Sequence, residues 1–234
     1  MTTVEMMYEF QSLLDTSVPA YAEQLRLNSD KIMMQLNIGY RRYILEKFLS
    51  SRDSNTNALT IQAHQDDLSN LIEVAHLPAV SIGNGELVGI GYSVVLPDNY
   101  YYYIRGAVVT TRADEIQTSD NLYSNLILTN SYQTFENAKT TRFNTPILRE
   151  PISILLQDKL VILVDKWTKI GSGNVCTLTY LKTPKNLGFE DTSTVTTIPE
   201  IAEVLHEDIV KYSYQLFMNN ISFSNRVNNP NNDN

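Results

Sequence analysis

The chain has 234 residues, of which 43% are hydrophobic and 19% are charged, so it is long enough to bury a core and its composition excludes wholesale disorder. Its 18 basic residues against 26 acidic ones give a formal net charge of −8. This balance argues against a surface that grips nucleic acid, because such binding depends on basic side chains that replace counterions on phosphates, although DNA would still slide past without sticking.

Three helices are predicted in an N-terminal helical part, residues 1–78. The apolar residues within 8–14 have the spacing of a short helix. A longer amphipathic helix follows the capping residues 28–30, with apolar side chains at steps of three and four from Ile32 to Phe48. A third helix is expected from near residue 60 or 63 to about residue 75, before Pro78.

A β-rich part is predicted in residues 79–195. Two runs rich in Val, Ile, Gly and Tyr, residues 80–97 and 100–112, have the composition of strands. The polar segment 113–149 is expected to be a long loop or arm with a function of its own. Residues 159–170 and 175–181 are expected to form a hairpin, because Gly and Asn in 171–174 supply the positive φ of a turn.

A C-terminal helix is predicted in residues 196–222, opened by Pro199 and packed with the N-terminal helices. Its apolar stripe runs from Ile201 to Leu216 at steps of four and three. The Asn-rich residues 223–234 are expected to be a flexible tail. The fold class is therefore predicted as α+β, with N-terminal helices, a central antiparallel β-region with a hairpin, and a C-terminal helix.

No catalytic, cofactor-binding or metal-binding residue is predicted, and we expect no enzyme. Gly171-Ser172-Gly173 precedes a strand, whereas a phosphate loop precedes a helix. The three histidines lack the spacing of a metal template, and a G-x-S-x-G motif is absent. The single cysteine, Cys176, forms no internal disulfide and is expected to be buried in a strand. Without a basic leader or an apolar run of about 18 residues, we expect a soluble protein of a reducing compartment.

Aromatic residues of the β-rich part are predicted to contact other proteins. Four consecutive tyrosines on a strand place two side chains on each face, one face for the core and the other for a contact. Stacking on nucleic-acid bases would need interleaved Lys or Arg, and only Arg105 is close. Packing within the monomer is the alternative explanation. The predicted contact residues are Tyr100, Tyr101, Tyr102, Tyr103, Tyr123, Tyr132, Phe135 and Phe143.

The order of these parts resembles the ring or connector proteins of crAss-like tailed bacteriophages. The matching stretches are LNSDKIMMQLNIGYRRYILEKF, ILREPI, TYLKTPKNL and IPEIAEVLHEDIVKYS. In that family a Tyr-Leu-Lys-x-Pro stretch precedes a Leu/Ile-Pro-Glu helix opening. Here these stretches are residues 180–184 and 198–200, and the resemblance spans nearly the whole chain.

The resemblance implies a structural ring protein of the portal–neck–tail assembly. It implies a homo-oligomeric collar, twelvefold, around the channel through which DNA leaves the capsid. The implied partners are other copies of the chain, the portal protein and other ring and tail proteins. DNA would pass without sequence-specific binding, and no membrane is involved. Head-to-tail contacts would close the ring, and the protein would belong to the neck or tail of a virion assembled in the host cytoplasm.

Two other functions remain open from the sequence. The Asn-, Thr- and Tyr-rich middle of the chain is compatible with a tail-fibre or receptor-binding module, which would trimerise and bind glycans. A phage-encoded enzyme or host-directed binding protein would instead work as a monomer with a well-formed polar pocket. A connector, unlike a tail-fibre or receptor-binding module, would neither trimerise nor bind glycans.

Overall fold

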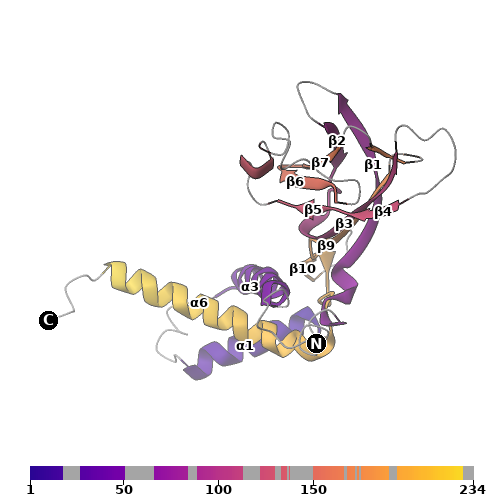
Figure 1. Ribbon diagram of the computed structural model, residues 1–234. Helices are drawn as coiled ribbons and strands as arrows, with labels where there is room; N and C mark the ends of the chain where they lie inside the picture. Colours follow the sequence, from indigo (N-terminus) through magenta and orange to yellow (C-terminus); the bar gives the residue numbers. More distant parts are fainter. Residues whose placement is uncertain are drawn as a thin grey trace. The chain divides into compact units, whose positions relative to one another are not determined.

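The computed structural model divides the chain into two compact units. Residues Met1–Leu71 and Pro184–Asn234 form one, called here the helical unit, and Ile72–Thr183 form the other, the sheet unit (Figure 1). The combination of helices and a large mixed sheet confirms the predicted α+β class. The structure describes residues 1–17, 27–50, 66–83, 89–112, 122–129, 133–135, 137, 150–165, 168–171, 173, 175–189 and 194–228.

Among its described residues, the helical unit contains three long helices, α1 (Thr3–Ser17), α3 (Ser29–Ser50) and α6 (His206–Asn228). Helix α6 packs against both α1 and α3, so the C-terminal helix joins the N-terminal ones as predicted (Figure 1). Phe10 lies at the centre, with its ring 6.1 Å from Tyr214 and 6.0 Å from Phe217. Short 3-10 turns at η1 (Ser69–Leu71) and η2 (Glu203–Leu205) complete the unit.

Side chains cap the first turns of two helices. The Thr2 amide donates to Glu5 Oε2 at 2.7 Å, and the Glu5 amide donates to Thr2 Oγ1 at 3.3 Å. This reciprocal pair is a capping box, which satisfies amides that have no partner inside the helix. At α3 the Lys31 amide donates to Asn28 Oδ1 at 3.0 Å, which confirms Asn28 as the predicted cap.

The sheet unit is built on a nine-stranded sheet with the order β4-β3-β9-β1-β2-β7-β6-β5, and β8 pairs with β3. A separate two-stranded parallel ladder, β10 (Asn186–Leu187) with β11 (Val195–Thr196), belongs to the helical unit. The strands of the large sheet are β1 (Ile72–Gly83), β2 (Gly89–Val95), β3 (Tyr100–Arg112), β4 (Leu122–Asn125), β5 (Ile127–Leu128), β6 (Ile152–Leu156), β7 (Lys159–Asp165), β8 (Thr168–Ile170) and β9 (Val175–Lys182).

Strand β1 connects the two halves of the sheet. Its residues up to Pro78 pair with β9, and from Ala79 onward they pair with β2. Such a strand lets a sheet fold over on itself and enclose a core. One buried cluster accordingly combines residues of both halves: Tyr92, Val94, Leu160, Ile162 and Val164 from β2 and β7, and Tyr103, Val108, Cys176, Leu178 and Tyr180 from β3 and β9.

The predicted third helix is wrong beyond Leu71. Residues 66–67 are helical and η1 follows, but β1 begins at Ile72. Ile72 and Val74 are β-branched and fit a pleated surface, and the pairing of residues 72–78 with β9 supplies hydrogen bonds that a helix would have to break. The predicted boundary after residue 78 therefore falls inside a strand.

The predicted hairpin is also wrong in its pairing, although its strands exist. Strand β7 pairs with β2 and β6, and β9 pairs with β1 and β3. Strands β8 and β9 follow one another along the same edge of β3, with Ile170 opposite Thr110 and Cys176 opposite Val108. Strands β8 and β9 therefore do not form a hairpin with each other, and Gly173 has the positive φ of 88°. A tight hairpin joins β6 to β7 instead, through residues 157 and 158.

Two further boundaries differ from the prediction. The C-terminal helix begins at His206 rather than beside Pro199, and it continues to Asn228, so residues 223–228 of the predicted tail are helical. Residues 229–234 lie outside the described residues. Within the predicted arm, residues 122–129 contribute β4 and β5 to the sheet and residues 133–135 form a helical turn.

Candidate functional site

The four consecutive tyrosines of β3 do not alternate regularly between the two faces. Tyr103 is buried in the sheet core and Tyr100 packs against the same core, three positions earlier. The register of β3 against β9 shifts between Tyr100 and Tyr102 and again after Tyr103. A bulge of this kind adds a residue to one strand and turns the following side chains to the other face. Tyr101 and Tyr102 are half-buried.

The other predicted contact residues are separated in the fold. Tyr123 lies on the edge strand β4 and is 85% exposed. Phe135 is buried in a small cluster with Ile154 and Leu163, so it packs within its own unit. Tyr132 and Phe143 lie outside the described residues. Among the described residues, the structure therefore does not bring the predicted contact residues into one patch.

A polar cluster in the sheet unit joins strands β1 and β9 to the turn before β3, and it was not predicted. The Tyr180 hydroxyl lies 2.8 Å from Glu73 Oε2 and 2.8 Å from Asn99 Oδ1, and Asn99 Nδ2 donates to Glu73 Oε2 at 2.9 Å. Lys182 Nζ lies 3.4 Å from Glu73 Oε1. The hydrogen bonds from Tyr180 and Asn99 lower the pKa of Glu73. Burial, followed by the bond to Glu73, raises the pKa of Tyr180 to about 12. Both groups thus hold fixed protonation states at neutral pH, which suits positioning rather than proton transfer.

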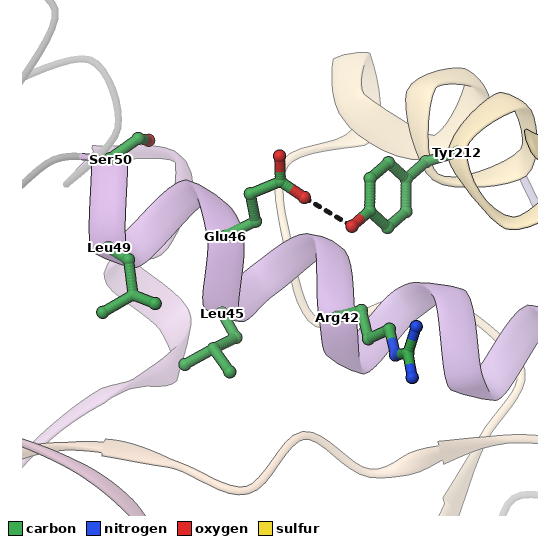
Figure 2. Close-up of a pocket in the computed structure, with 6 residues that line it drawn as sticks. All are labelled: Arg42, Leu45, Glu46, Leu49, Ser50 and Tyr212. Carbon is green, nitrogen blue, oxygen red and sulfur yellow. Dashed lines mark hydrogen bonds between the residues drawn. The ribbon is translucent and has the colours of Figure 1, made fainter. Parts of the chain in front are cut away.

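A groove of about 450 Å³ opens on the helical unit between α3 and α6 (Figure 2). The Tyr212 hydroxyl donates a hydrogen bond to Glu46 Oε2 across the two helices. Leu45 and Leu49 extend from the other side of α3 (Figure 2). The lining residues are Arg42, Leu45, Glu46, Leu49, Ser50 and Tyr212.

Aromatic and charged side chains continue beside the groove. The rings of Tyr43 and Tyr212 meet edge to face with centroids 5.7 Å apart. Lys47 Nζ lies 5.7 Å from the centre of the Tyr43 ring and 2.8 Å from Asp67 Oδ2. Burial, together with the carboxylates of Asp208 and Asp67, raises the pKa of Tyr43 to about 12. The bond to Glu46 raises the pKa of Tyr212. Both tyrosines are therefore uncharged at neutral pH. The groove offers a partner the apolar side chains of Leu45 and Leu49 together with uncharged hydroxyl groups that can form hydrogen bonds.

Helix α3 also binds the segment that leads into α6. Asn37 Oδ1 accepts from the Leu187 amide at 2.7 Å, and Asn37 Nδ2 donates to the Leu187 carbonyl at 3.0 Å. One turn further on, Arg41 donates to Asn186 Oδ1 at 2.7 Å. The Glu200 amide donates to the Tyr40 hydroxyl at 2.9 Å. We call this set of bonds the α3 tether.

The α3 tether holds the chain at Glu200 before the C-terminal helix begins. The backbone amide of Glu200 is committed to Tyr40, and its carboxylate accepts from the Lys185 amide at 2.8 Å. The Glu200 side chain is therefore bound to the chain that precedes it. The helix begins only after η2, at His206.

Other reactive side chains of the described residues do not form a site. Cys176 is buried, and burial raises the pKa of its thiol to about 12, so the thiol is protonated and unreactive. His76 lies near Thr177, and the buried His206 ring contacts the Ile201 carbonyl at 3.3 Å. Among the described residues, no three His, Cys, Asp or Glu side chains gather as they would around a metal ion. None of the described helices has the length and apolar content needed to cross a membrane.

The sequence contains a pattern that could have indicated the groove, but this pattern does not identify what the helix contacts. Leu45 and Leu49 are spaced one turn apart, outside the stripe that contains Leu36 and Tyr40. A second apolar stripe on a helix indicates a second contact, but not its partner.

No protein-family model matches the chain, and a search of curated proteins gives no match.

Proposed function

We propose that the chain is a structural ring protein of a phage portal–neck–tail assembly. Copies of it form a homo-oligomeric collar around the channel through which DNA leaves the capsid. The protein acts through its contact surfaces, without a catalytic residue. It belongs to the neck or tail of the virion.

The observation that carries this proposal is the α3 tether. The resemblance to connector proteins depends on stretches far apart in the sequence, and three of them meet in the helical unit. Asn37 and Tyr40 belong to LNSDKIMMQLNIGYRRYILEKF, Leu187 to TYLKTPKNL and Glu200 to the Ile-Pro-Glu opening. These three matched stretches thus form one hydrogen-bonded structure, which supports treating them together as a signature of the family.

Charge is a second line of support. A collar around DNA has to let the duplex move, and a net charge of −8 keeps phosphates from binding tightly. The groove between α3 and α6 and the exposed Tyr8 of α1 offer two separate surfaces. A subunit that contacts two neighbours in a ring needs at least two such surfaces.

Density-gradient sedimentation tests the proposal. Purified protein is mixed with purified rings of the portal protein from the same genome and compared with protein alone. We expect the protein to travel with the rings and to saturate at one copy per portal subunit. An unrelated acidic protein of similar size is the control and should stay at the top of the gradient. Protein that stays at the top beside bare rings would contradict direct docking on the portal.

A further inference from the structure

Helix α1 presents an exposed face with an aromatic residue at its centre. Tyr8 is 72% exposed and Val4, one turn earlier, is 44% exposed. Met6, Phe10 and Leu14 lie on the opposite, buried face. An exposed tyrosine beside an exposed valine is the kind of anchor that dominates protein–protein contacts.

This exposed face of α1 is acidic. The helix contains Glu5, Glu9 and Asp15 and neither Lys nor Arg. Glu5 and Asp15 are exposed on either side of Tyr8. A partner surface for this helix should therefore be apolar with basic side chains at its margin.

Helix α3 presents such a surface on the side away from its buried stripe. Met34 is 55% exposed and Leu49 is 44% exposed, and Ile38 and Leu45 lie between them on the same side. The exposed Arg41 and Arg42 flank this second stripe. Its C-terminal half, at Leu45 and Leu49, forms the apolar wall of the α3–α6 groove.

We propose that Tyr8 of one copy of the chain occupies the α3–α6 groove of the next copy, with the acidic face of α1 against Arg42. The groove has a volume of about 450 Å³ and is lined by Leu45 and Leu49 as well as by Arg42. The two surfaces are different and complementary, so the contact is head-to-tail, and repetition of it closes a ring or extends a filament. This inference rests on the proposed ring function, for which it supplies the interface between subunits.

Disulfide trapping tests the contact. Tyr8→Cys and Leu49→Cys are combined in one chain, while Cys176 is left in place because it is buried and protonated. Mild oxidation at high protein concentration, with and without portal rings, should give a covalent ladder of dimers, trimers and larger species. Each single-cysteine variant should stop at dimers. Mixing isotope-labelled with unlabelled chains and sequencing the 8–49 cross-linked peptide shows that the bond joins two copies.

A matched control moves the first cysteine to an equally exposed tyrosine elsewhere. Tyr123→Cys with Leu49→Cys should give no ladder, since β4 is not part of the proposed contact. Charge reversal provides a second readout. Arg42→Glu should reduce the ladder of the double-cysteine chain by roughly three- to tenfold, and adding Asp15→Arg should restore it.

The proposal is overturned if the 8–49 pair gives no more ladder than the Tyr123 control, with portal rings present or absent. It is also overturned if Arg42→Glu leaves the ladder unchanged. These outcomes can be distinguished from a failure of the proposed ring function. A chain that docks on portal rings without an 8–49 bond would keep the ring function and lose this interface. A chain that forms the ladder but leaves portal rings bare would keep the interface and lose portal docking.

Discussion

Gly39 of α3 and Ser213 of α6 meet at the closest approach of the two helices. A Cβ atom placed on Gly39 would lie 2.5 Å from Ser213 Cβ and 2.7 Å from Ser213 Cα. Ser213 is buried, and its hydroxyl donates to the Ile209 carbonyl at 2.6 Å. The crossing of α3 and α6, and with it the shape of the groove, therefore depends on the missing side chain of Gly39.

Replacement of Gly39 by alanine should destabilise the chain. Helix propensity alone would favour alanine by about 1 kcal/mol. The new methyl group would meet the backbone of α6, which has to move and lose packing, so we expect the free energy of unfolding to fall by roughly 1–3 kcal/mol. Urea unfolding measures the change. Gln11→Ala on the exposed side of α1 is the control and should change little, whereas a Gly39→Ala chain as stable as the wild type would contradict the close approach.

The α3 tether makes a prediction about one backbone amide. Asn37→Leu leaves both the amide and the carbonyl of Leu187 without their partner, which should cost roughly 1–3 kcal/mol. Hydrogen exchange of the Leu187 amide should become faster in this variant. Arg41→Ala, which removes only the exposed bond to Asn186, is the matched control and should leave that amide protected. Equal protection of Leu187 in both variants would show that Asn37 does not hold this segment.

Glu73 should make stability depend on pH in acid. Its pKa is lowered from the ordinary value of 4.5, chiefly by hydrogen bonds from Tyr180 and Asn99. A group with a lowered folded-state pKa stabilises the fold above its unfolded-state pKa, and this contribution is lost as pH falls through the lowered value. Glu73→Gln should therefore be less stable than the wild type at pH 7, with a difference that shrinks below about pH 4.

Urea unfolding between acid and neutral pH checks this expectation. Tyr180→Phe removes the hydroxyl that contributes most to the shift. In the Tyr180→Phe chain, the effect of Glu73→Gln and its pH dependence should both be smaller. A pH-independent difference between Glu73→Gln and the wild type would assign the effect to packing instead.

The tight turn between β6 and β7 predicts a stabilising substitution. Gln157 has a φ of 51°, in the left-handed region that costs a side-chain-bearing residue roughly 1–2 kcal/mol. Gln157→Gly should raise the thermal midpoint, although the greater freedom of glycine in the unfolded chain offsets part of the gain. Asp158→Gly is the matched control and should lower the midpoint, because the positive φ values of the described residues do not include Asp158. Two substitutions with equal effects would contradict this conformation of the turn.

The sequence predicted the elements whose signals are local. The apolar repeat of Ile32, Leu36 and Tyr40 is buried as expected, and the strands at 159–165 and 175–182 exist. The pairing of the strands could not be predicted, because it is decided by residues far apart in the sequence. Strand β9 pairs with β1, which lies about a hundred positions earlier. For the same reason the third helix was expected to continue to about residue 75, whereas β1 begins at Ile72.

The candidate site was missed for a related reason. The groove exists because Gly39 lets α6 approach α3, and a single glycine in a helical pattern does not identify its partner. The cluster of Glu73, Asn99 and Tyr180 is assembled from two strands, β1 and β9, and the turn before β3. The four tyrosines of β3 were correctly placed on a strand, but the bulges that set their faces arise from the pairing with β9.

Negative-stain electron microscopy of portal rings mixed with this protein tests the central claim most directly. We expect one added layer on each portal ring, with the rotational symmetry of the portal, and no such layer on rings imaged alone. The mixture with Arg42→Glu should show incomplete layers if the subunit contact is as inferred. Portal rings that stay bare at high protein concentration, beside protein that forms no rings by itself, would contradict a collar that docks on the portal.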